Sequence, residues 1–173
     1  MFALLWVILL MMIQSSNVLA AEQQEPTTVQ FVNLDLYAGK WYEIARYPNR
    51  FQKKCIAAVS ATYKLRKDGK VEVVNQCKQS NGKTKLARGS ARVVDKVTNA
   101  KLKVTFFWPF SGDYWILDLD PDYKYAVVGE GKRKYLWILS RTPEIDPEIY
   151  SQILDRISNQ GYDTAKLIRT NPE

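Results

Sequence analysis

Apolar and polar residues alternate along most of the chain between residues 40 and 140, which is the pattern of half-buried β-strands. Turn sequences such as Asp68-Gly69 and Asn81-Gly82 separate these segments, and a glycine there permits a positive φ. Eight such segments follow one another, at residues 40–47, 59–65, 70–77, 85–94, 101–106, 113–119, 123–128 and 135–140. Their number and even spacing predict an all-β fold, an eight-stranded antiparallel up-and-down β-barrel.

Two stretches depart from the strand pattern. Pro109 has no backbone N–H, so residues 107–112 are expected to form an aromatic loop. Near the C-terminus, Asp146 is expected to cap a helix that has Pro147 in its first turn and Gly161 after its end. The apolar stripe of this helix, formed by Ile149, Tyr150, Ile153, Leu154 and Ile157, predicts that it packs on the outside of the barrel. Residues 162–168 are expected to add a short closing strand.

The composition is that of one globular domain with a basic surface. The chain has 173 residues, of which 46% are hydrophobic and 25% charged, with a formal net charge of +7. The basic residues are scattered, with short clusters at 50–54, 64–70 and 132–134. This distribution argues against a nucleic-acid partner. It favours solvated faces, with a peripheral contact to anionic membrane as a second interpretation.

Residues 1–20 have the pattern of a secretory signal peptide. The apolar run 2–13 is short for a membrane span, and Val18-Leu19-Ala20 offers small residues for cleavage, although no Lys or Arg precedes the run. Residues 21–30 are polar and are expected to form a flexible arm, followed by one domain over residues 31–173. Phe31, Leu34 and Leu36 are expected to plug one end of the barrel.

Cys55 and Cys77 are the only cysteines. Export to an oxidising compartment permits a disulfide between them, and both fall near the same end of two consecutive strands. The alternative is two independent free thiols, and a bridge is the favoured interpretation.

Three separated motifs together resemble the lipocalin family. They are Gly39-Lys40-Trp41, the turn with Asp122-Tyr123, and Arg141 at the end of the last strand. In lipocalins these motifs meet at the closed end of an eight-stranded cup. The resemblance covers roughly residues 35–170 and is strongest to the bacterial outer-membrane lipocalins and apolipoprotein D. Proline replaces threonine at Pro121, so the middle motif is degenerate.

The resemblance implies roles for Gly39, Trp41, Asp122, Tyr123 and Arg141 in the structure of the closed end, not in ligand contact. The guanidinium of Arg141 is expected to pack over the Trp41 indole as a cation–π pair. The bacterial outer-membrane lipocalins carry a lipidated cysteine at the cleavage site. Residues 1–20 contain no cysteine, so a soluble periplasmic or secreted protein is expected.

Candidate chemistry for catalysis is sparse. The chain has no histidine, the commonest general base and metal ligand, so neither a metal site nor a cofactor is expected. It has no G-x-S-x-G elbow and no glycine-rich phosphate loop. Pairs among the carboxylates Glu43, Asp113, Asp118 and Asp120 leave open the alternative of an isomerase-like, lipid-modifying enzyme on the same barrel. The favoured interpretation is a protein that is not an enzyme.

A barrel of eight strands can hold one small guest, and the alternation predicts which residues line its interior. The segment 113–119 is ambiguous, because its two faces, Tyr114 with Ile116 and Trp115 with Leu117, are equally apolar; Tyr114 and Ile116 are taken as the inward pair. Trp41 is expected to face inward with Glu43 and Ala45. The residues expected to contact ligand are Ala57, Val59, Ala61, Tyr63, Val73, Asn75, Val104, Phe106, Trp108, Tyr114, Ile116, Trp137 and Leu139. Asn75, Tyr63 and Tyr114 are the candidates to meet a polar head.

The function expected from these patterns and the resemblance is binding, transport or storage of a fatty acid or lysophospholipid in membrane lipid maintenance. The protein is expected to act as a monomer or homodimer. Lys53, Lys54 and Lys132 are expected near the mouth of the barrel, where they would attract an anionic group weakly.

Overall fold

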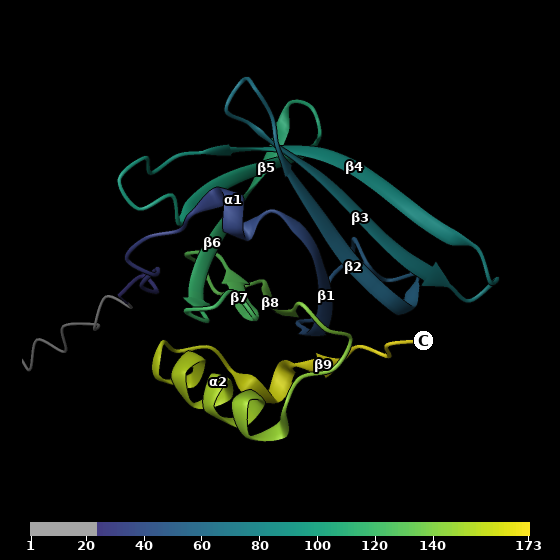
Figure 1. Cartoon of the computed structure of the whole chain (residues 1–173). Helices are drawn as coiled ribbons and strands as arrows, with labels where there is room; N and C mark the ends of the chain where they lie inside the picture. The colour runs from purple at the N-terminus through teal and green to yellow at the C-terminus, as the bar shows by residue number, and fades with distance from the viewer. Residues whose placement is uncertain (1–23) are drawn as a thin grey trace, which may run out of the picture.

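The structure, a computed structural model, describes residues 24–173, so the expected signal peptide lies outside the described residues (Figure 1). A short helix, α1 (Leu34–Tyr37), precedes the strands. The strands are β1 (Gly39–Arg46), β2 (Cys55–Leu65), β3 (Val71–Gln79), β4 (Thr84–Val93), β5 (Lys101–Phe107), β6 (Phe110–Leu119), β7 (Tyr125–Gly129) and β8 (Leu136–Ser140). The chain ends with helix α2 (Pro147–Asn159), the 3₁₀ helix η1 (Thr164–Lys166) and strand β9 (Ile168–Arg169).

The eight main strands form a closed barrel. Each strand from β1 to β8 pairs antiparallel with the next, and β1 also pairs with β8, which removes the open edges. The predicted fold class is therefore confirmed. The tyrosine and tryptophan content and the alternation along each strand explain it, because these residues suit a sheet that is buried on one face.

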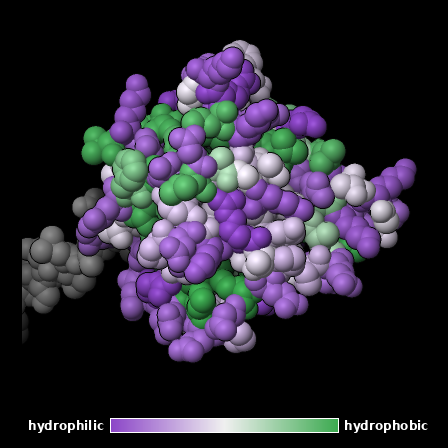
Figure 2. All heavy atoms as spheres, in the orientation of Figure 1, coloured by the Kyte–Doolittle hydropathy of each residue, from purple (hydrophilic) through white to green (hydrophobic). Residues whose placement is uncertain are grey.

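Two hydrophobic clusters lie on opposite sides of the barrel wall. The inner one includes Trp41, Ile116 and Leu139. The outer one joins the outward faces of β1, β6, β7 and β8 to Ile153 and Ile157 of α2, which are fully buried. Figure 1 shows α2 outside the barrel, as predicted, and Figure 2 shows a hydrophobic patch near α2 and further hydrophobic groups over the upper half of the same face.

Helix α2 begins where the sequence predicts. The Asp146 side chain accepts hydrogen bonds from the backbone N–H groups of Glu148 and Ile149, and Pro147 occupies the first turn. Gly161 follows the helix with φ +80°, a conformation that glycine adopts without strain. Local residues at each end of α2 therefore determine where the helix begins and ends.

The segment after α2 differs from the predicted strand over residues 162–168. It contains η1 and only a two-residue strand, which pairs with Ala45 and Arg46 of β1. The next residues continue toward β2, because Ala58 N–H donates to the carbonyl of Asn171. Since β1 and β2 pair directly only over residues 39–42 and 60–63, this tail fills the seam where they separate.

A bulge in β1 makes the prediction for Ala45 wrong. The register shifts between Glu43 and Ala45, so Ala45 joins the outer cluster with Ile44. Arg46 then pairs with Trp137, whose side chain packs on the inner cluster. Because a bulge inserts one residue, it places Arg46 on the inward face that simple alternation had assigned to Ala45.

Irregular pairing in β2 likewise corrects Ala57. The register shifts on both sides of Ala57, and Ala58 has φ +50°. Ala57 is paired with Lys78 of β3, an exposed residue one position past the inward-facing Cys77. Ala57 is therefore buried beneath the C-terminal tail, with which it forms a bridge at Asn171, and it does not share a face with Val59.

The aromatic loop is shorter than predicted and points away from the interior. Strand β5 ends at Phe107 and β6 begins at Phe110, which leaves Trp108 and Pro109 as the turn. Trp108 is 89% exposed, with Phe107 and Phe110 nearly as exposed beside it. The prediction that Trp108 lines the interior is wrong, because the strand ends before it and the turn carries its side chain outside.

Residues 24–30, part of the expected flexible arm, have contacts with the barrel. Pro26 is buried, and Val29 N–H donates to the Ile116 carbonyl at 3.0 Å. The flexibility of the arm stays a prediction. The chain then enters α1, which is capped by the Asn33 side chain and places Tyr37 inside the barrel.

Candidate ligand-binding site

The closed end of the barrel is built around Trp41 and Arg141. Trp41 is fully buried, and its indole N–H donates to the Tyr37 carbonyl at 2.8 Å. The guanidinium carbon of Arg141 lies 3.8 Å from the centre of the Trp41 ring, so the predicted cation–π pair is present. Arg141 also donates to the backbone carbonyls of Leu36, Lys40 and Tyr123, which ties α1, β1 and the β6–β7 turn together.

The other residues of the closed-end motif contribute unequally. Gly39 has φ +98°, and a Cβ there would lie 3.2 Å from a guanidinium nitrogen of Arg141, so both backbone strain and space require glycine. The Tyr123 hydroxyl accepts from Asn33 N–H. The Asp122 side chain is exposed and pairs with Lys124, whereas the Asp120 side chain accepts the backbone N–H groups of Asp122 and Lys124 and forms the turn.

Most of the predicted lining residues face the interior. The inner cluster and the strand register place Val59, Ala61, Tyr63, Val73, Asn75, Val104, Phe106, Tyr114, Ile116, Trp137 and Leu139 on the inward face. Phe106, Tyr114 and Trp137 are inward-facing yet only partly buried. In a solidly packed core these three side chains would be fully buried, so solvent reaches the part of the interior that they line. Contact of these residues with a ligand stays a prediction.

Three phenols form a hydrogen-bonded chain across the interior. The hydroxyls of Tyr37 and Tyr114 are 2.7 Å apart, and Tyr114 donates to Tyr63 at 2.9 Å. Burial raises the pKa of Tyr63 to about 12 and raises the pKa values of Tyr37 and Tyr114 well above their ordinary range. The three tyrosines therefore stay protonated, and their hydroxyl groups hydrogen-bond to one another.

A small enclosed cavity adjoins this tyrosine chain at the closed end. Its volume is about 20 Å³ and its walls, which include Leu102 and Ile116, are almost wholly apolar. A space of that size admits about one water molecule and no alkyl chain. An alkyl tail would therefore have to lie between this cavity and the mouth of the barrel, among the partly buried residues Phe106, Tyr114 and Trp137.

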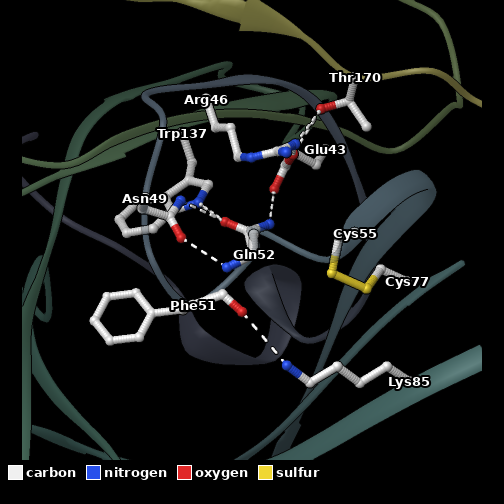
Figure 3. The surroundings of a disulfide bond; sticks show 10 residues. All are labelled: Glu43, Arg46, Asn49, Phe51, Gln52, Cys55, Cys77, Lys85, Trp137 and Thr170. Atoms are coloured by element: carbon white, nitrogen blue, oxygen red, sulfur yellow. Dashed lines mark hydrogen bonds and ion pairs between the residues drawn. A yellow bond between two sulfur atoms is a disulfide. The ribbon is translucent and has the colours of Figure 1, made fainter. Parts of the chain in front are cut away.

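A buried polar network lies on the inner wall of β1 toward the mouth of the barrel (Figure 3). The Glu43 carboxylate accepts hydrogen bonds from Arg46 Nη1 at 2.5 Å, Thr170 Oγ1 at 2.6 Å and Gln52 Nε2 at 2.5 Å. Glu43 and Arg46 are only 5% and 8% exposed. Burial of this ion pair is tolerated because the carboxylate receives three donors.

The β1–β2 loop folds over this network. Gln52 accepts from Trp137 Nε1 at 2.9 Å and from Asn49 at 2.8 Å while it donates to Glu43. From the other wall, Lys85 Nζ lies 3.4 Å from the Phe51 carbonyl. Figure 3 shows Gln52 at the centre of these contacts, with Phe51 extending beside it, so the loop covers part of the mouth.

The predicted disulfide is present and anchors the far end of this loop. Cys55, the first residue of β2, is joined to Cys77 of β3, with their Cα atoms 5.5 Å apart. The bridge lies beside the Glu43 network (Figure 3). The loop is thus tied covalently at one end and by Gln52 in its middle.

Arg46, Gln52 and Tyr37 are site residues that the sequence reasoning missed. Arg46 follows the pair Ile44-Ala45, where two consecutive apolar residues interrupt the alternation, and this interruption is a signal of the bulge. Gln52 lies in a loop and Tyr37 in a helix outside the strand pattern, so their inward contacts had no signal in the alternation.

Two further observations limit the chemistry of residues 24–173. They hold no group of three or more His, Cys, Asp or Glu side chains placed to bind a metal ion. None of their helices is long and apolar enough to cross a membrane. What the geometry defines is a small closed antiparallel barrel with an apolar inner wall, a polar mouth and a helix outside.

Comparison with known proteins identifies the family. The pattern of the lipocalin-like domain matches residues 32–172, and the chain belongs to the lipocalin family, whose members bind small hydrophobic ligands. The chain is 44% identical over 157 residues to temperature-induced lipocalin-1 of Arabidopsis thaliana, which covers 86% of this chain and 84% of the relative. It is 41% identical over 143 residues to the outer membrane lipoprotein Blc of Escherichia coli K12, with 82% and 80% covered.

The barrel also superposes on solved structures. Insecticyanin from the tobacco hornworm Manduca sexta aligns with a TM-score of 0.70 at 23% identity, covering 87% of this chain and 85% of that one. At this identity the similarity supports the fold alone. The resemblance to bacterial outer-membrane lipocalins stated from the sequence is confirmed by the relatives.

Proposed function

We propose that this lipocalin binds one single-chain lipid, a fatty acid or lysophospholipid, inside the barrel and carries or stores it without chemical change. The proposed setting is the maintenance of membrane lipids by an exported, soluble protein in the periplasm or outside the cell. The similarity to an outer membrane lipoprotein supports a setting near membranes.

The observation that carries the proposal is the incomplete burial of aromatic side chains on the inner wall of the barrel. Phe106, Tyr114 and Trp137 face inward but are not fully buried, and the inner wall of β4 includes the small residues Ala87 and Gly89, with the Phe106 ring packed over Gly89. Apolar surface that solvent reaches is stabilised when an alkyl chain covers it. Burial of about ten methylene groups contributes roughly 8 kcal/mol before the entropy cost of binding, which is enough for micromolar affinity.

A peripheral contact with anionic membrane is part of the same proposal. The exposed aromatic tip, defined as Phe107, Trp108 and Phe110, offers side chains that partition into the interface of a bilayer. Beside it, an open groove is lined by Trp108 and Phe106 together with the basic residues Lys64, Arg66, Lys67 and Arg88. Aromatic residues flanked by cations suit an anionic lipid surface, where the contact would weaken as salt is raised.

Native mass spectrometry and lipid titration test the proposal. The protein recovered from its own compartment is expected to carry one lipid per chain, and the delipidated protein is expected to take up one oleate or one lysophosphatidylethanolamine with its mass unchanged. Conversion of the lipid to a product would instead favour an isomerase-like enzyme. Absence of any bound lipid, together with no uptake at micromolar concentrations, would refute lipid binding.

Two neighbouring residues provide a matched pair of variants. Ala87 faces the interior opposite Asn75, whereas Arg88 faces outward opposite Val74. Ala87→Trp is expected to fill the interior and lower lipid affinity at least about tenfold, because the ring takes the place of the alkyl chain. Arg88→Trp, the same side chain on the outer face, is expected to leave the affinity within about twofold. Equal effects of the two variants would place the lipid elsewhere.

A further inference from the structure

Two buried polar atoms of inward-facing residues have no hydrogen-bond partner. Within residues 24–173, the buried side-chain atoms without a partner are Arg46 Nε, Asn75 Oδ1 and Gln160 Oε1. The first two belong to the inner wall of the barrel. A buried N–H of a guanidinium that meets no acceptor costs free energy until a ligand or a water molecule accepts from it.

The partners of Arg46 leave one side of its guanidinium free. Nη1 donates both to Glu43 and to Thr170, and no hydrogen bond within the described chain involves Nε or Nη2. Arg46 is only 8% exposed and lies over the interior, paired in register with Trp137. A guanidinium presents its donors in a planar fork, so one edge can bind Glu43 while another binds an oxyanion.

The charge of the mouth network favours an anionic acceptor over a neutral one. Glu43 is already matched by Arg46 and accepts from three donors. Lys85 lies on the opposite wall, on the same face as Cys77, and within residues 24–173 its ammonium group hydrogen-bonds only to the Phe51 carbonyl, at 3.4 Å. Among the residues drawn in Figure 3, two cations therefore accompany one carboxylate, and one negative charge on a ligand would balance them.

We propose that Arg46 determines the ligand's head group: its free Nε edge binds the single negative charge of a carboxylate or phosphodiester at the mouth of the barrel. The inference rests on the proposed function and deepens it. The tail then extends past Trp137 toward the tyrosine chain, and the β1–β2 loop covers the head through Gln52. Glu43 and Thr170 act as positioning residues, because they hold the guanidinium with its free edge over the interior.

Lipids with one tail and different heads test this assignment. Oleate, 1-oleoyl-lysophosphatidylglycerol and uncharged oleyl alcohol are titrated at pH 8.5, and binding is measured by displacement of the neutral probe N-phenyl-1-naphthylamine. The wild-type protein is expected to bind at least one of the two anions about tenfold or more tightly than the alcohol. The anion with the larger preference identifies the carboxylate or the phosphodiester as the natural head.

The variants are chosen so that folding is preserved. Arg46→Gln alone would leave Glu43 buried without its cation, so it is combined with Glu43→Gln. The double variant is expected to bind anion and alcohol within about twofold of each other, with the affinity for the alcohol retained. Arg46→Lys keeps the pair with Glu43 but lacks the second edge, and it is expected to lose most of the preference. Arg92→Gln removes the same charge from an exposed position on the outward face of β4, paired in register with Lys103, and is expected to keep the wild-type ratio.

Each outcome has a distinct meaning. A wild-type ratio near one, or a wild-type ratio that survives in folded Arg46→Lys, overturns the role of Arg46, because water would then be the partner of Nε. Failure of the wild-type protein to bind any of the three lipids overturns the proposed function itself. Equal loss of preference in Arg92→Gln would show that net charge, and not the mouth of the barrel, selects the anion.

Discussion

Replacement of Arg141 by alanine is expected to destabilise the barrel without changing the lipid that it binds. The substitution removes the cation from the face of Trp41, where the guanidinium carbon lies 3.8 Å from the ring centre. It also removes the donors to the carbonyls of Leu36, Lys40 and Tyr123. These three contacts join segments that are distant in sequence, so the closed end loses its main cross-link.

The magnitude follows from these contacts. The cation–π pair contributes about 1–2 kcal/mol, since Trp41 is fully buried on its other sides. The three hydrogen bonds contribute roughly 0.5 kcal/mol each, at the low end of the usual range, because Arg141 is partly exposed and water can replace it. The expected loss is about 3 kcal/mol, which lowers the melting temperature by roughly 6–12 °C for a domain of this size.

Urea denaturation followed by tryptophan fluorescence measures the change, with lipid stoichiometry determined on the same preparations. Arg141→Lys keeps the charge and is expected to retain part of the stability. Arg88→Ala, which breaks an exposed ion pair to Glu72 at 3.6 Å, is the control and is expected to change stability by less than about 0.5 kcal/mol. A loss below 0.5 kcal/mol in Arg141→Ala, or a folded Arg141→Ala protein that no longer binds lipid, would refute the structural role.

Three further predictions concern other parts of the barrel. Replacing Cys55 and Cys77 by serine is expected to cost about 3 kcal/mol of unfolding free energy, measured in urea, because the bridge closes a loop of about twenty residues; an unchanged midpoint would contradict this. Gly129→Ala is expected to cost about 2 kcal/mol or more in the same assay, since a Cβ there would lie 2.3 Å from the Tyr162 hydroxyl. Burial raises the pKa values of Tyr63 and Tyr162 to about 12, against about 10 when unfolded, so their contribution to stability is full below pH 10 and is lost as the pH rises through 12. The phenolate absorbance of Tyr63 and Tyr162, taken as the difference between the wild-type protein and a Tyr63→Phe/Tyr162→Phe variant, should therefore rise together with the loss of far-ultraviolet circular dichroism in that window, and a rise of this difference at pH 10 without unfolding would oppose the assignment.

The regular parts of the fold could be predicted because local pattern and tertiary burial agree there. Alternation separates Tyr114 and Ile116 from Trp115 and Leu117, and the structure has the same division, with the first pair inside as expected. Because these two faces are equally apolar, the pattern itself did not decide between them. Asp146 and Gly161 mark the ends of α2 through local chemistry that needs no tertiary information.

The errors occur where the backbone leaves the regular pleat. The bulge before Arg46 and the irregular pairing around Ala57 each exchange the faces of neighbouring residues, and strict alternation cannot anticipate them. Trp108 follows the inward pattern of β5 but lies beyond the end of the strand. Gln52 reaches Glu43 from a loop whose path depends on tertiary contacts. The apolar wall of the candidate site was thus predictable, and the polar mouth was not.

The most direct test of the central claim, a lipid tail held inside the barrel, is a crystal structure with 9,10-dibromostearate bound and anomalous data collected at the bromine edge. Two bromine peaks are expected within the interior, beside Phe106, Tyr114 and Trp137 and above the tyrosine chain. Bromine peaks only at the exposed aromatic tip or on the outer wall, with the interior filled by the protein's own side chains, would contradict it.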